Sequence, residues 1–523
     1  MVRPGPGLTL VVTDAPDPRR WKALGVCLVA GFMTLLDVSI VNVALPSIRE
    51  GIGASTSELQ WVVSGYALAF GLVLVPAGRL GDARGRRTMF IVGVALFTLS
   101  SLAAGLAPTA FLLVVARLVQ GLGGGILNPQ VSGLIQELFR GRERGRAFGM
   151  LGAVIGISTA VGPVLGGLII RLLGVETGWR WIFFVNIPIG IAAIALSLRL
   201  LPGGPREETP TRRDLDLVGV GLLGAGVLAV LLPLVEQQEW RGDAKWALLA
   251  GGVMLLAVFV LWERRYAARG HAALVDLSLF ALPSYSAGSA LAMAYFSGFT
   301  GIFFVLTLYF QGGLGYSPLL AGLAVTPFAA GSAVAAALGG RVVTTAGRPL
   351  VVGGLVAVVL GLVLTDVALA LHGDSRSAGW WTALPLLVGG LGSGLVISPN
   401  QTLTLTEVPV ARAGTAGGVL QTGQRMGTAV GIAVVGSTYF GALSSSRGDY
   451  GQAASQGLRA AVALTTVALL IGVADVVRSR RSSRGSSARA AAGHQPAHEG
   501  HADATSQGDG EGASTPSRVG GET

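Results

Sequence analysis

Fourteen apolar runs follow one another along most of this chain. A helix of about 20 apolar residues spans the hydrocarbon core of a bilayer, and a helix satisfies every backbone polar group without water. The pattern predicts an all-α integral membrane protein with fourteen spans. The expected spans are 23–45, 59–78, 88–107, 110–129, 147–170, 181–200, 215–235, 246–263, 285–310, 319–340, 349–371, 382–403, 413–440 and 457–477.

The composition excludes an ordinary soluble globule, because 51% of the residues are hydrophobic and only 13% are charged. Residues 1–22 contain Pro and Arg, and the first apolar run is long enough to span, so no cleavable signal is expected. The single cysteine, Cys27, lies in the first run, and an intrachain disulfide is excluded.

The net charge of +10 raises the question of nucleic-acid binding. The basic residues are instead spread over alternate loops, for example at 84–87, 140–146, 212–213 and 264–265. This bias is typical of cytoplasmic loops in an inner-membrane protein. We therefore expect a bacterial cytoplasmic-membrane protein with both termini in the cytoplasm and no nucleic-acid partner.

Internal repeats divide the chain into two related halves. The Gly-Arg pairs of 78–86 recur in 340–348, and the small residues of 145–149 recur in 414–418. Two repeats in the same order are common in secondary transporters. The predicted organisation is a cytoplasmic N-terminus (1–22), a six-helix bundle (23–201), a linker with two extra spans assigned a packing role (202–270), a second six-helix bundle (280–477) and a disordered cytoplasmic tail (478–523).

Asp37 lies well inside the first apolar run. A carboxylate in hydrocarbon costs several kcal/mol unless it is protonated, paired or hydrated. Two interpretations remain open, a proton- or cation-handling acid and an ion-paired structural acid. Ser39 and Asn42 are polar companions on the same run. Asn42 is retained as a candidate residue of the substrate cavity.

Arg117 lies in the fourth run, where Gly121, Gly124 and Asn128 share its face at about 100° per residue. An arginine cannot face lipid cheaply, so it is expected to face protein or a water-filled cavity. Asp37 is the expected partner. Arg117 then either tunes the proton affinity of this acid or forms a permanent structural pair with it.

The segment 78–87 joins the second and third spans and places Asp82 among several arginines, beside the ends of neighbouring helices. Such a cluster predicts a conformational latch, an ion pair that holds one conformation closed and breaks on opening. The alternative is an ordinary basic loop with one balancing acid. The candidate latch residues are Gly78, Asp82, Gly85 and Arg86.

The fifth span carries glycine pairs four residues apart, Gly145/Gly149, Gly152/Gly156 and Gly162/Gly166. In a bilayer this spacing makes a backbone groove that another helix can approach closely. Pro163 removes a backbone hydrogen bond and is expected to kink the helix. The candidate motif residues are Gly156, Gly162, Pro163, Gly166 and Gly167.

Polar and aromatic residues of the second half supply further candidates. Gln421, Arg425 and Thr428 share a helix face, and the repeat aligns Arg425 with Gly156, so Arg425 should point toward the interface between the halves. Two interpretations of Arg425 remain open, a functional residue of the substrate cavity and a structural plug paired with backbone carbonyls. Asn400 on the preceding span is expected to reach the same substrate cavity.

An aromatic stripe in the second half contains Tyr295, Phe299, Phe303 and Phe310. The stripe is suited either to a flat or cationic ligand or to packing. Asp366 lies near the end of its span, where it is either hydrated or a secondary acid.

Four ordered motifs, LLDVSIVNVALP, GRLGDARGRR, RLVQG from Arg117 and GPVLGG from Gly162, resemble those of the major facilitator superfamily. The set is similar to the fourteen-span drug:proton antiporter branch, the multidrug and quaternary-ammonium exporter type. In that superfamily the Gly-Pro…Gly-Gly motif is associated with antiporters. Three departures are Ser39 in place of Thr, Ala83 in place of a basic residue and Thr344 at the position equivalent to Asp82. The second latch should therefore be weak or absent.

The resemblance implies a major facilitator fold and proton-coupled efflux of amphiphilic drugs, antibiotics or secondary metabolites by alternating access. The alternatives are a dedicated exporter of an endogenous metabolite and, more remotely, a non-transporting membrane sensor. No enzyme activity, cofactor or metal is expected, because no nucleophile–base pair, phosphate-binding loop or metal set stands inside the spans. The expected partners are the small-molecule substrate, protons and lipid, and the expected state is a monomer.

Overall fold

The computed structural model describes residues 17–203, 216–235, 240, 242–372 and 375–492. Fourteen helical segments in this part of the chain are long and apolar enough to cross a membrane, which confirms the predicted spans. The elements are α1 (Arg20–Ile52), α2 (Thr56–Arg84), α3 (Arg86–Leu106), α4 (Ala110–Leu138), α5 (Gly141–Leu173), α6 (Val175–Phe184), α7 (Asn186–Leu200), α8 (Leu217–Val235), α9 (Ala244–Ala268), η2 (Leu277–Ala281), α10 (Pro283–Leu308), η3 (Tyr309–Gly313), α11 (Pro318–Ala346), α12 (Arg348–His372), α13 (Ala378–Trp381), α14 (Ala383–Thr404), η4 (Val410–Arg412), α15 (Ala413–Ser445) and α16 (Tyr450–Ala492).

Local sequence signals set where these helices begin and end. Ser55 and Glu58 form a reciprocal capping box at the start of α2, and Thr109 and Ser317 cap α4 and α11. Gly85, between α2 and α3, has a φ of 101°, which a residue with a side chain rarely adopts. The chain can therefore reverse direction there within one residue.

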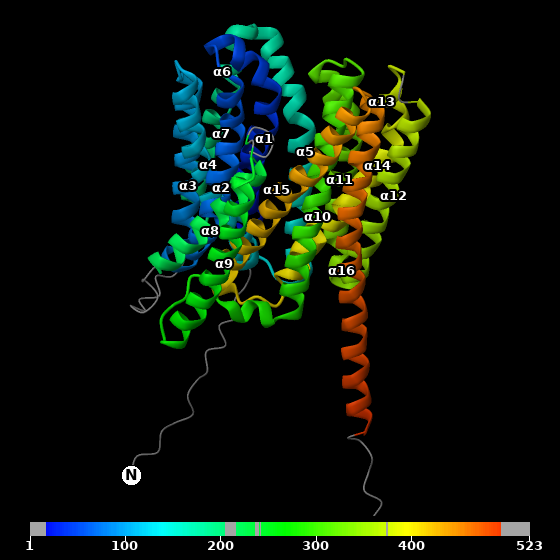
Figure 1. Ribbon diagram of the computed structural model, residues 1–523. Helices are drawn as coiled ribbons and strands as arrows, with labels where there is room; N and C mark the ends of the chain where they lie inside the picture. Colours follow the sequence, from blue (N-terminus) through cyan, green and yellow to red (C-terminus); the bar gives the residue numbers. More distant parts are fainter. Residues whose placement is uncertain (1–16, 204–215, 236–239, 241, 373–374, 493–523) are drawn as a thin grey trace, which may run out of the picture. The chain divides into compact units, whose positions relative to one another are not determined.

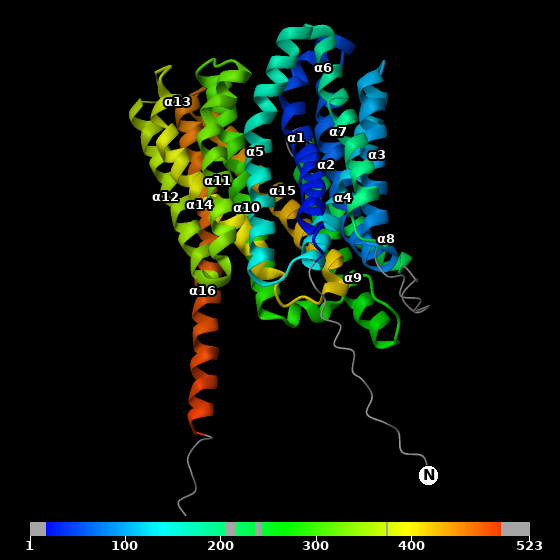
Figure 2. The same ribbon diagram turned by 180° about the vertical axis from the view of Figure 1, so that it is seen from behind.

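Helices α1–α7 form one bundle and α10–α16 form another, up to Val476 (Figures 1 and 2). Four helix pairs make the main contacts between the halves: α5 packs on α11, α2 packs on α15, α14 packs on α5, and α15 packs on α4. The apolar core around Phe90 and Phe97 lies mainly in the first bundle, and it continues into the second through residues such as Tyr285 and Leu420. The second has a core that includes Leu355, Leu362 and Phe328.

The two extra helices are more than a linker. α8 contacts both α2 and α15, and its partner α9 packs on it. One apolar cluster unites Val75 of α2, Leu231 of α8, Phe259 of α9 and Ala433 of α15. The pair therefore packs along the seam between the halves. Two acids, Asp216 and Glu263, are buried at the ends of this helix pair.

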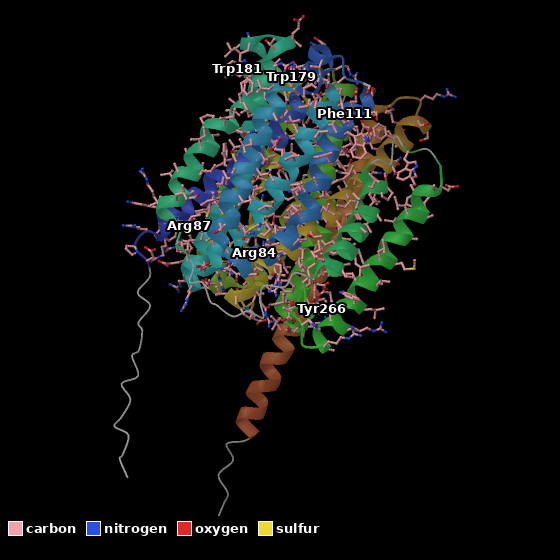
Figure 3. The ribbon with its side chains drawn as sticks, turned by 90° about the vertical axis from the view of Figure 1, so that its left-hand side faces the viewer. Arg84, Arg87, Phe111, Trp179, Trp181 and Tyr266 are labelled. Atoms are coloured by element: carbon pink, nitrogen blue, oxygen red, sulfur yellow. The ribbon has the colours of Figure 1, made fainter. Side chains whose placement is uncertain are left out.

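The two ends of the bundles differ in character (Figure 3). Arg84 and Arg87 lie near one end, and Phe111, Trp179 and Trp181 lie near the other. Phe111 and Trp181 are exposed, as expected of aromatic side chains at a membrane interface. We call the end that carries Arg84 and Arg87 the basic end. The chain reverses direction there at 84–87, 138–141, 346–349 and 404–413.

The tail differs in part from its prediction. Disorder was expected from residue 478, but helix α16 continues to Ala492. Its last residues are rich in Ala and Arg, which favour helix. Residues 493–523 of the predicted tail and 1–16 of the predicted N-terminus lie outside the described residues.

Candidate functional site

Asp37 lies at the centre of a buried polar network in the first bundle. Its Oδ2 accepts a hydrogen bond from Arg117 Nη1 at 2.5 Å. Its Oδ1 accepts bonds from Gln120 Nε2 at 2.9 Å and from Asn186 Nδ2 at 3.0 Å. Asp37 is 0% exposed and Arg117 is 1% exposed. The expected pairing of Asp37 with Arg117 is therefore present.

Arg117 is held from several sides. Its Nε donates to Val62 O at 3.0 Å and its Nη1 also donates to Gln120 Oε1 at 2.7 Å. The guanidinium lies over the Tyr66 ring, 4.2 Å from the ring centroid. Ser101 accepts from both Gln120 and Asn186 and donates to a backbone carbonyl. A buried ion pair persists only when further hydrogen bonds compensate for lost hydration, and this network supplies them.

The contacts of Asp37 engage both carboxylate oxygens, Oδ2 through Arg117 and Oδ1 through Gln120 and Asn186. One guanidinium and two side-chain amides therefore compensate for the hydration that this buried acid has lost.

Two aromatic rings of α2 connect this network with the second bundle. Arg425 of α15 lies over the Phe70 ring, 4.4 Å from its centroid, and the Phe70 and Tyr66 centroids are 6.0 Å apart. Arg425 therefore points toward the interface between the halves, as the repeat predicted. Among the described residues no carboxylate pairs with Arg425. Arg117 and Arg425 flank the same pair of rings.

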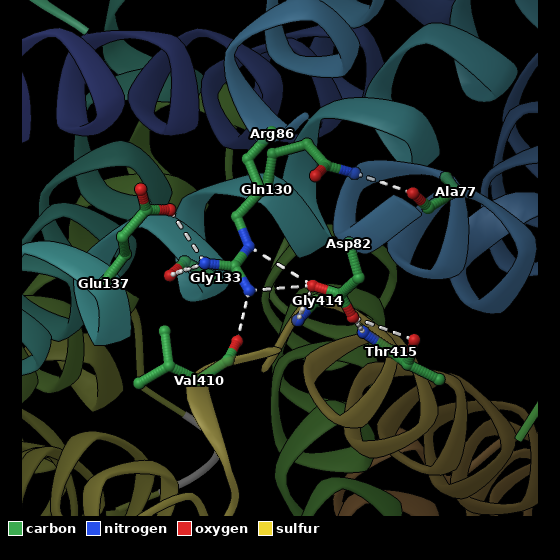
Figure 4. Close-up of polar contacts among 9 residues, drawn as sticks. All are labelled: Ala77, Asp82, Arg86, Gln130, Gly133, Glu137, Val410, Gly414 and Thr415. Atoms are coloured by element: carbon green, nitrogen blue, oxygen red, sulfur yellow. Dashed lines mark hydrogen bonds and ion pairs between the residues drawn. The ribbon is translucent and has the colours of Figure 1, made fainter. Parts of the chain in front are cut away.

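The latch predicted around Asp82 is closed, and it crosses between the halves (Figure 4). Asp82 Oδ1 accepts from Gly414 N at 3.0 Å, and Oδ2 accepts from Thr415 N at 2.8 Å and Thr415 Oγ1 at 2.9 Å. Gly414 and Thr415 belong to the first turn of α15, whose amides lack partners within the helix. The carboxylate therefore caps a helix of the other half, where the helix dipole favours negative charge.

Arg86 completes the latch on the other side of Asp82. Its Nη2 and Nε donate to Asp82 Oδ1 at 2.8 and 3.2 Å, and its Nη1 donates to Glu137 Oε2 at 2.8 Å and Gly133 O at 3.2 Å. Nη2 also donates to Val410 O in the second half. A Cβ added to Gly78 would lie 2.3 Å from Gly414 O, so glycine permits the approach that brings the latch together.

The glycines of α5 face two different partners. A Cβ on Gly145, Gly149 or Gly156 would collide with the backbone of α11, at Gly340, Ala336 and Ala329 respectively. The prediction of close helix approach is therefore confirmed along this face.

The later glycines of α5 turn to α1. Gly162 lies against Ser39 and Gly166 against Ile40, while Pro163 packs on Gly322 of α11 and Gly167 lies near Leu319. Ser39 Oγ donates to Thr159 O at 3.3 Å. The Gly-Pro…Gly-Gly motif thus packs inside the first bundle and against the second bundle at once.

Some predicted cavity residues have other roles. Asn400 is 3% exposed, its Nδ2 donates to Gly288 O at 2.9 Å and its Oδ1 accepts from Arg348 Nη1 at 2.6 Å. These bonds hold Asn400 inside the second bundle, and its place in the substrate cavity stays a prediction. Asn42 is exposed and is not a partner of Asp37, while Gln421 is half-buried one turn from Arg425.

The aromatic stripe is mainly core. Tyr295 is 1% exposed and lies 5.7 Å, centroid to centroid, from Phe299, which also contacts Phe303 and Phe328. Phe310 is buried against Tyr316. Packing, left open as an alternative for Tyr295 and Phe299, is the arrangement that the structure has. Asp366 pairs with Arg459 Nε at 3.1 Å, away from the network of Asp37.

The second-half equivalent of the latch forms no cross-link between the halves. Arg348 Nε pairs with Asp475 Oδ2 at 2.9 Å, and its other nitrogens donate to Asn400 and to Ser284 O at 2.6 Å. All three partners belong to its own bundle. Thr344, at the position of Asp82, is exposed. The expected weakness of a second latch agrees with these contacts.

Several functional residues were missed from sequence. Gln120, Asn186 and Ser101 are buried polar residues in apolar runs, and this signal was available in the sequence. Gly414 was predicted only as part of an internal repeat. Its amide donates to Asp82 because Gly414 lies at the start of α15, which its residue type does not indicate. Thr415 and Glu137 carry no sequence signal of a latch.

Comparisons with known proteins place this geometry in a family. Residues 27–432 match the Major Facilitator Superfamily. The chain is 40% identical over 446 residues to a probable actinorhodin transporter of Streptomyces coelicolor, covering 84% of this chain and 76% of that protein. It is 36% identical to puromycin resistance protein pur8 of Streptomyces alboniger (88% and 90% covered) and 33% identical to the tetracenomycin C resistance and export protein of Streptomyces glaucescens (80% and 76%).

Solved structures support the same fold. The human organic anion transporter MFSD10 (TETRAN) has a TM-score of 0.64 at 14% identity, covering 87% of this chain and all of that chain (100%). The proton:xylose symporter XylE has a TM-score of 0.61 at 16% identity, covering 87% and 95%. With its fourteen apolar helices and its bacterial transporter relatives, this chain is a multi-pass membrane protein. It belongs to the major facilitator superfamily.

Proposed function

We propose that this protein exports amphiphilic drugs, antibiotics or secondary metabolites across the cytoplasmic membrane in exchange for protons. The observation that carries the proposal is the extended similarity to a probable actinorhodin transporter, a tetracenomycin C resistance and export protein and a puromycin resistance protein. We place the basic end and both termini in the cytoplasm, because Lys and Arg are enriched in cytoplasmic loops.

The buried pair of Asp37 and Arg117 is the element that couples protons to transport in this proposal. Protonation of Asp37 cancels its charge and releases Arg117 from the 2.5 Å contact. The freed guanidinium remains against Tyr66, one aromatic ring away from Phe70 and Arg425. Its charge then acts on the interface between the halves, where alternating access requires the bundles to separate.

The closed latch corresponds to one state of this cycle. While Asp82 caps α15, the cytoplasmic side is closed, and substrate and protons can exchange with the outside. One proton moving down a potential of 100 mV supplies about 2.3 kcal/mol, which supports roughly a fortyfold gradient of a neutral compound.

The test uses everted membrane vesicles energised to an acidic interior, with puromycin as the probe and collapse of the pH gradient as the readout. Wild-type protein should dissipate the gradient on addition of puromycin. Asp37→Asn removes the titratable acid but keeps its size, and we expect at least a tenfold loss of this response. Asp366→Asn is the matched control, because Asp366 is also an acid within a span, but it pairs with Arg459, away from the network of Asp37.

Unaltered, puromycin-dependent proton movement in Asp37→Asn would remove the assigned coupling role. If neither puromycin nor a panel of amphiphilic compounds moved protons in the wild type, the export function itself would be contradicted.

A further inference from the structure

Two carboxyl groups that belong to neither the central network nor the latch are buried together at the basic end. Asp216, just before α8, is 3% exposed, and Glu263, in the last turns of α9, is 0% exposed. The two groups crowd Gly219, where an added Cβ would lie 2.5 Å from Asp216 Oδ2 and 2.6 Å from Glu263 Oε1. They are thus close enough to share a hydrogen bond.

The hydrogen bonds of the pair leave one position for a proton. Asp216 Oδ1 accepts from Gly219 N at 2.8 Å and Oδ2 accepts from Trp262 Nε1 at 2.7 Å. Glu263 Oε2 accepts from Val275 N at 3.2 Å. Glu263 Oε1 is buried and has no donor among the described residues. A proton between Oε1 and Asp216 Oδ2 supplies the missing donor.

Electrostatics requires the same proton. Two carboxylates side by side in a buried site cannot both ionise without a large cost, so one of them retains a proton. In the described part of the chain no Lys or Arg forms an ion pair with either group. The pair is therefore held together by a shared proton rather than by a counter-ion.

Glu263 also borders a cavity of about 490 Å³ that reaches the latch. The charged and titratable groups of its walls are Arg79 and Asp82 of α2, Glu263 and Arg264 of α9, His271 and Asp276 of the following segment, and Arg412 of η4. Thr415, which donates to Asp82, lies in the same wall.

The other acids of this cavity are already committed. Asp82 is bound by α15 and Arg86. Asp276 pairs with Arg412. Burial disfavours its charged form, but hydrogen bonds from Ser278 and the charges of Arg412 and Arg79 outweigh burial and lower the pKa of Asp276. A carboxyl group with a lowered pKa stays ionised at neutral pH, so Asp276 supplies no proton there.

We propose that Asp216 and Glu263 form a second proton-binding site, separate from Asp37, whose proton keeps the latch closed. When the cytoplasmic side becomes alkaline, the pair ionises and its members repel each other. Glu263 then turns toward the cavity, where Arg79, Arg264 and Arg412 attract it and the contacts around Asp82 and η4 loosen. In this way a change of cytoplasmic pH at the two extra helices alters the stability of the latch. This role depends on the orientation given in the proposed function.

The proton is detected through Trp262, whose indole donates directly to Asp216. The full-length protein in lipid nanodiscs is titrated from pH 5 to 9, and the tryptophan fluorescence of Trp262→Phe is subtracted from that of the wild type. We expect the fluorescence difference, which isolates Trp262, to change with pH. Glu263→Gln and Asp216→Asn should each abolish this change. His271→Gln should retain it, although His271 stacks on Tyr266 and Tyr266 stacks on Trp262.

The effect on the latch is read separately. Ser132 is 1% exposed, it accepts from Gln401 Nε2 at 3.1 Å across the interface, and it lies against Gly417 of α15. A Ser132→Cys reporter, with Cys27→Ala removing the native thiol, should react with maleimide only when the basic end opens. Because maleimide reacts with the thiolate, each rate is divided by the rate of the same cysteine in denatured protein at the same pH. The corrected rate should rise by up to about tenfold per pH unit as the pair ionises, the limit for one proton, and level off above the midpoint. The corrected rate should be independent of pH in Glu263→Gln.

Three results would overturn the proposal. The first is a pH-dependent fluorescence difference that persists in both carboxyl variants. The second is a fluorescence difference that His271→Gln abolishes. The third is a maleimide rate with the same pH dependence in Glu263→Gln and in the wild type. If one carboxyl variant fails to fold, the other decides, and an infrared carboxylic-acid band of the wild type that disappears on alkalinisation provides an independent measurement. None of these readouts needs a substrate, so a failure here is distinct from a failure of puromycin-driven proton movement.

Discussion

The two halves carry the same Gly-Arg…Gly-Arg pattern at the basic end, yet they use it differently. In the first half, Asp82 and Arg86 reach across to α15 and Val410 of the second half. In the second half, Arg348 bonds to Asp475 and Asn400 of its own bundle. The closed basic end is therefore fastened by charge on the α2–α15 side and by glycine packing on the α5–α11 side.

One residue position accounts for much of this difference. The first half has Asp82 four residues after Gly78, and the second has Thr344 four residues after Gly340. Both glycines touch the first turns of a helix of the other half, because a Cβ on Gly78 would meet Gly414 O and one on Gly340 would meet Gly145 O. The scaffold is thus nearly symmetric, but only the first half supplies the anion that a helix N-terminus binds.

The largest expected effect comes from Asp82→Asn. This change removes the ion pair with Arg86 and the charge at the start of α15, and hydrogen bonds to charged groups contribute about 1.5–3 kcal/mol each. We expect the maleimide rate of the Ser132→Cys reporter to rise at least about tenfold, since each 1.4 kcal/mol is a factor of ten.

Arg348→Gln tests the other side of that prediction. The arginine has the equivalent place in the repeat, but its bonds stay inside one bundle. The substitution Arg348→Gln should lower the thermal stability because Asp475 is left buried and unpaired. The maleimide rate should stay near that of the wild type. Equal rates for the two variants would show that the latch is not one-sided.

A smaller effect is expected from Gly340→Ala. The added Cβ would lie 2.5 Å from Gly145 O, so α5 and α11 must move apart. Overpacking of this kind costs about 1–3 kcal/mol, and the closed state should be destabilised by part of that amount. Gly353→Ala on α12 is the matched control, because no atom lies within 4 Å of its added Cβ. A maleimide rate in Gly340→Ala equal to that of the control would contradict the assigned close contact.

The smallest effect is expected from Thr344→Asp, which gives the second half the missing acid. The new carboxylate would stand near the start of α5, where an anion at a helix N-terminus contributes about 0.3–1 kcal/mol. The maleimide rate should fall by about twofold to fivefold at low salt and recover at high salt, because exposed charges are screened. A rate that rises instead would show that the two helix ends are not equivalent.

The sequence predicted the fourteen spans and the two halves because hydrocarbon leaves a chain few choices besides helices. Asp37 and Arg117 could be paired for the same reason, since opposite charges in adjacent spans have no other compensation. The identity of their remaining partners was not predictable, because a lone Gln120 or Asn186 can equally bond to a backbone carbonyl. Asn400 is an example, because its amide donates to the backbone carbonyl of Gly288.

Position within an apolar run misled the prediction elsewhere. Asp216 and Glu263 stand at the ends of their runs, where charged groups usually meet water, and only the packing of α8 against α9 buries them. The extension of α16 to Ala492 was missed because composition without apolar periodicity was interpreted as disorder. Tertiary contacts decided the burial of the two acids, whereas the helix propensity of Ala and Arg accounts for the end of α16.

The contact of α8 with both α2 and α15 has a mechanical consequence. When the bundles rock, α2 and α15 move apart, and α8 must slide over at least one of them. Its side chains in this contact are aliphatic, such as Val227 and Leu231, and they form no directional bonds that sliding would break. This contact should therefore resist the motion only weakly, and any preference of the added helices for one end state arises from the carboxyl pair at their basic end.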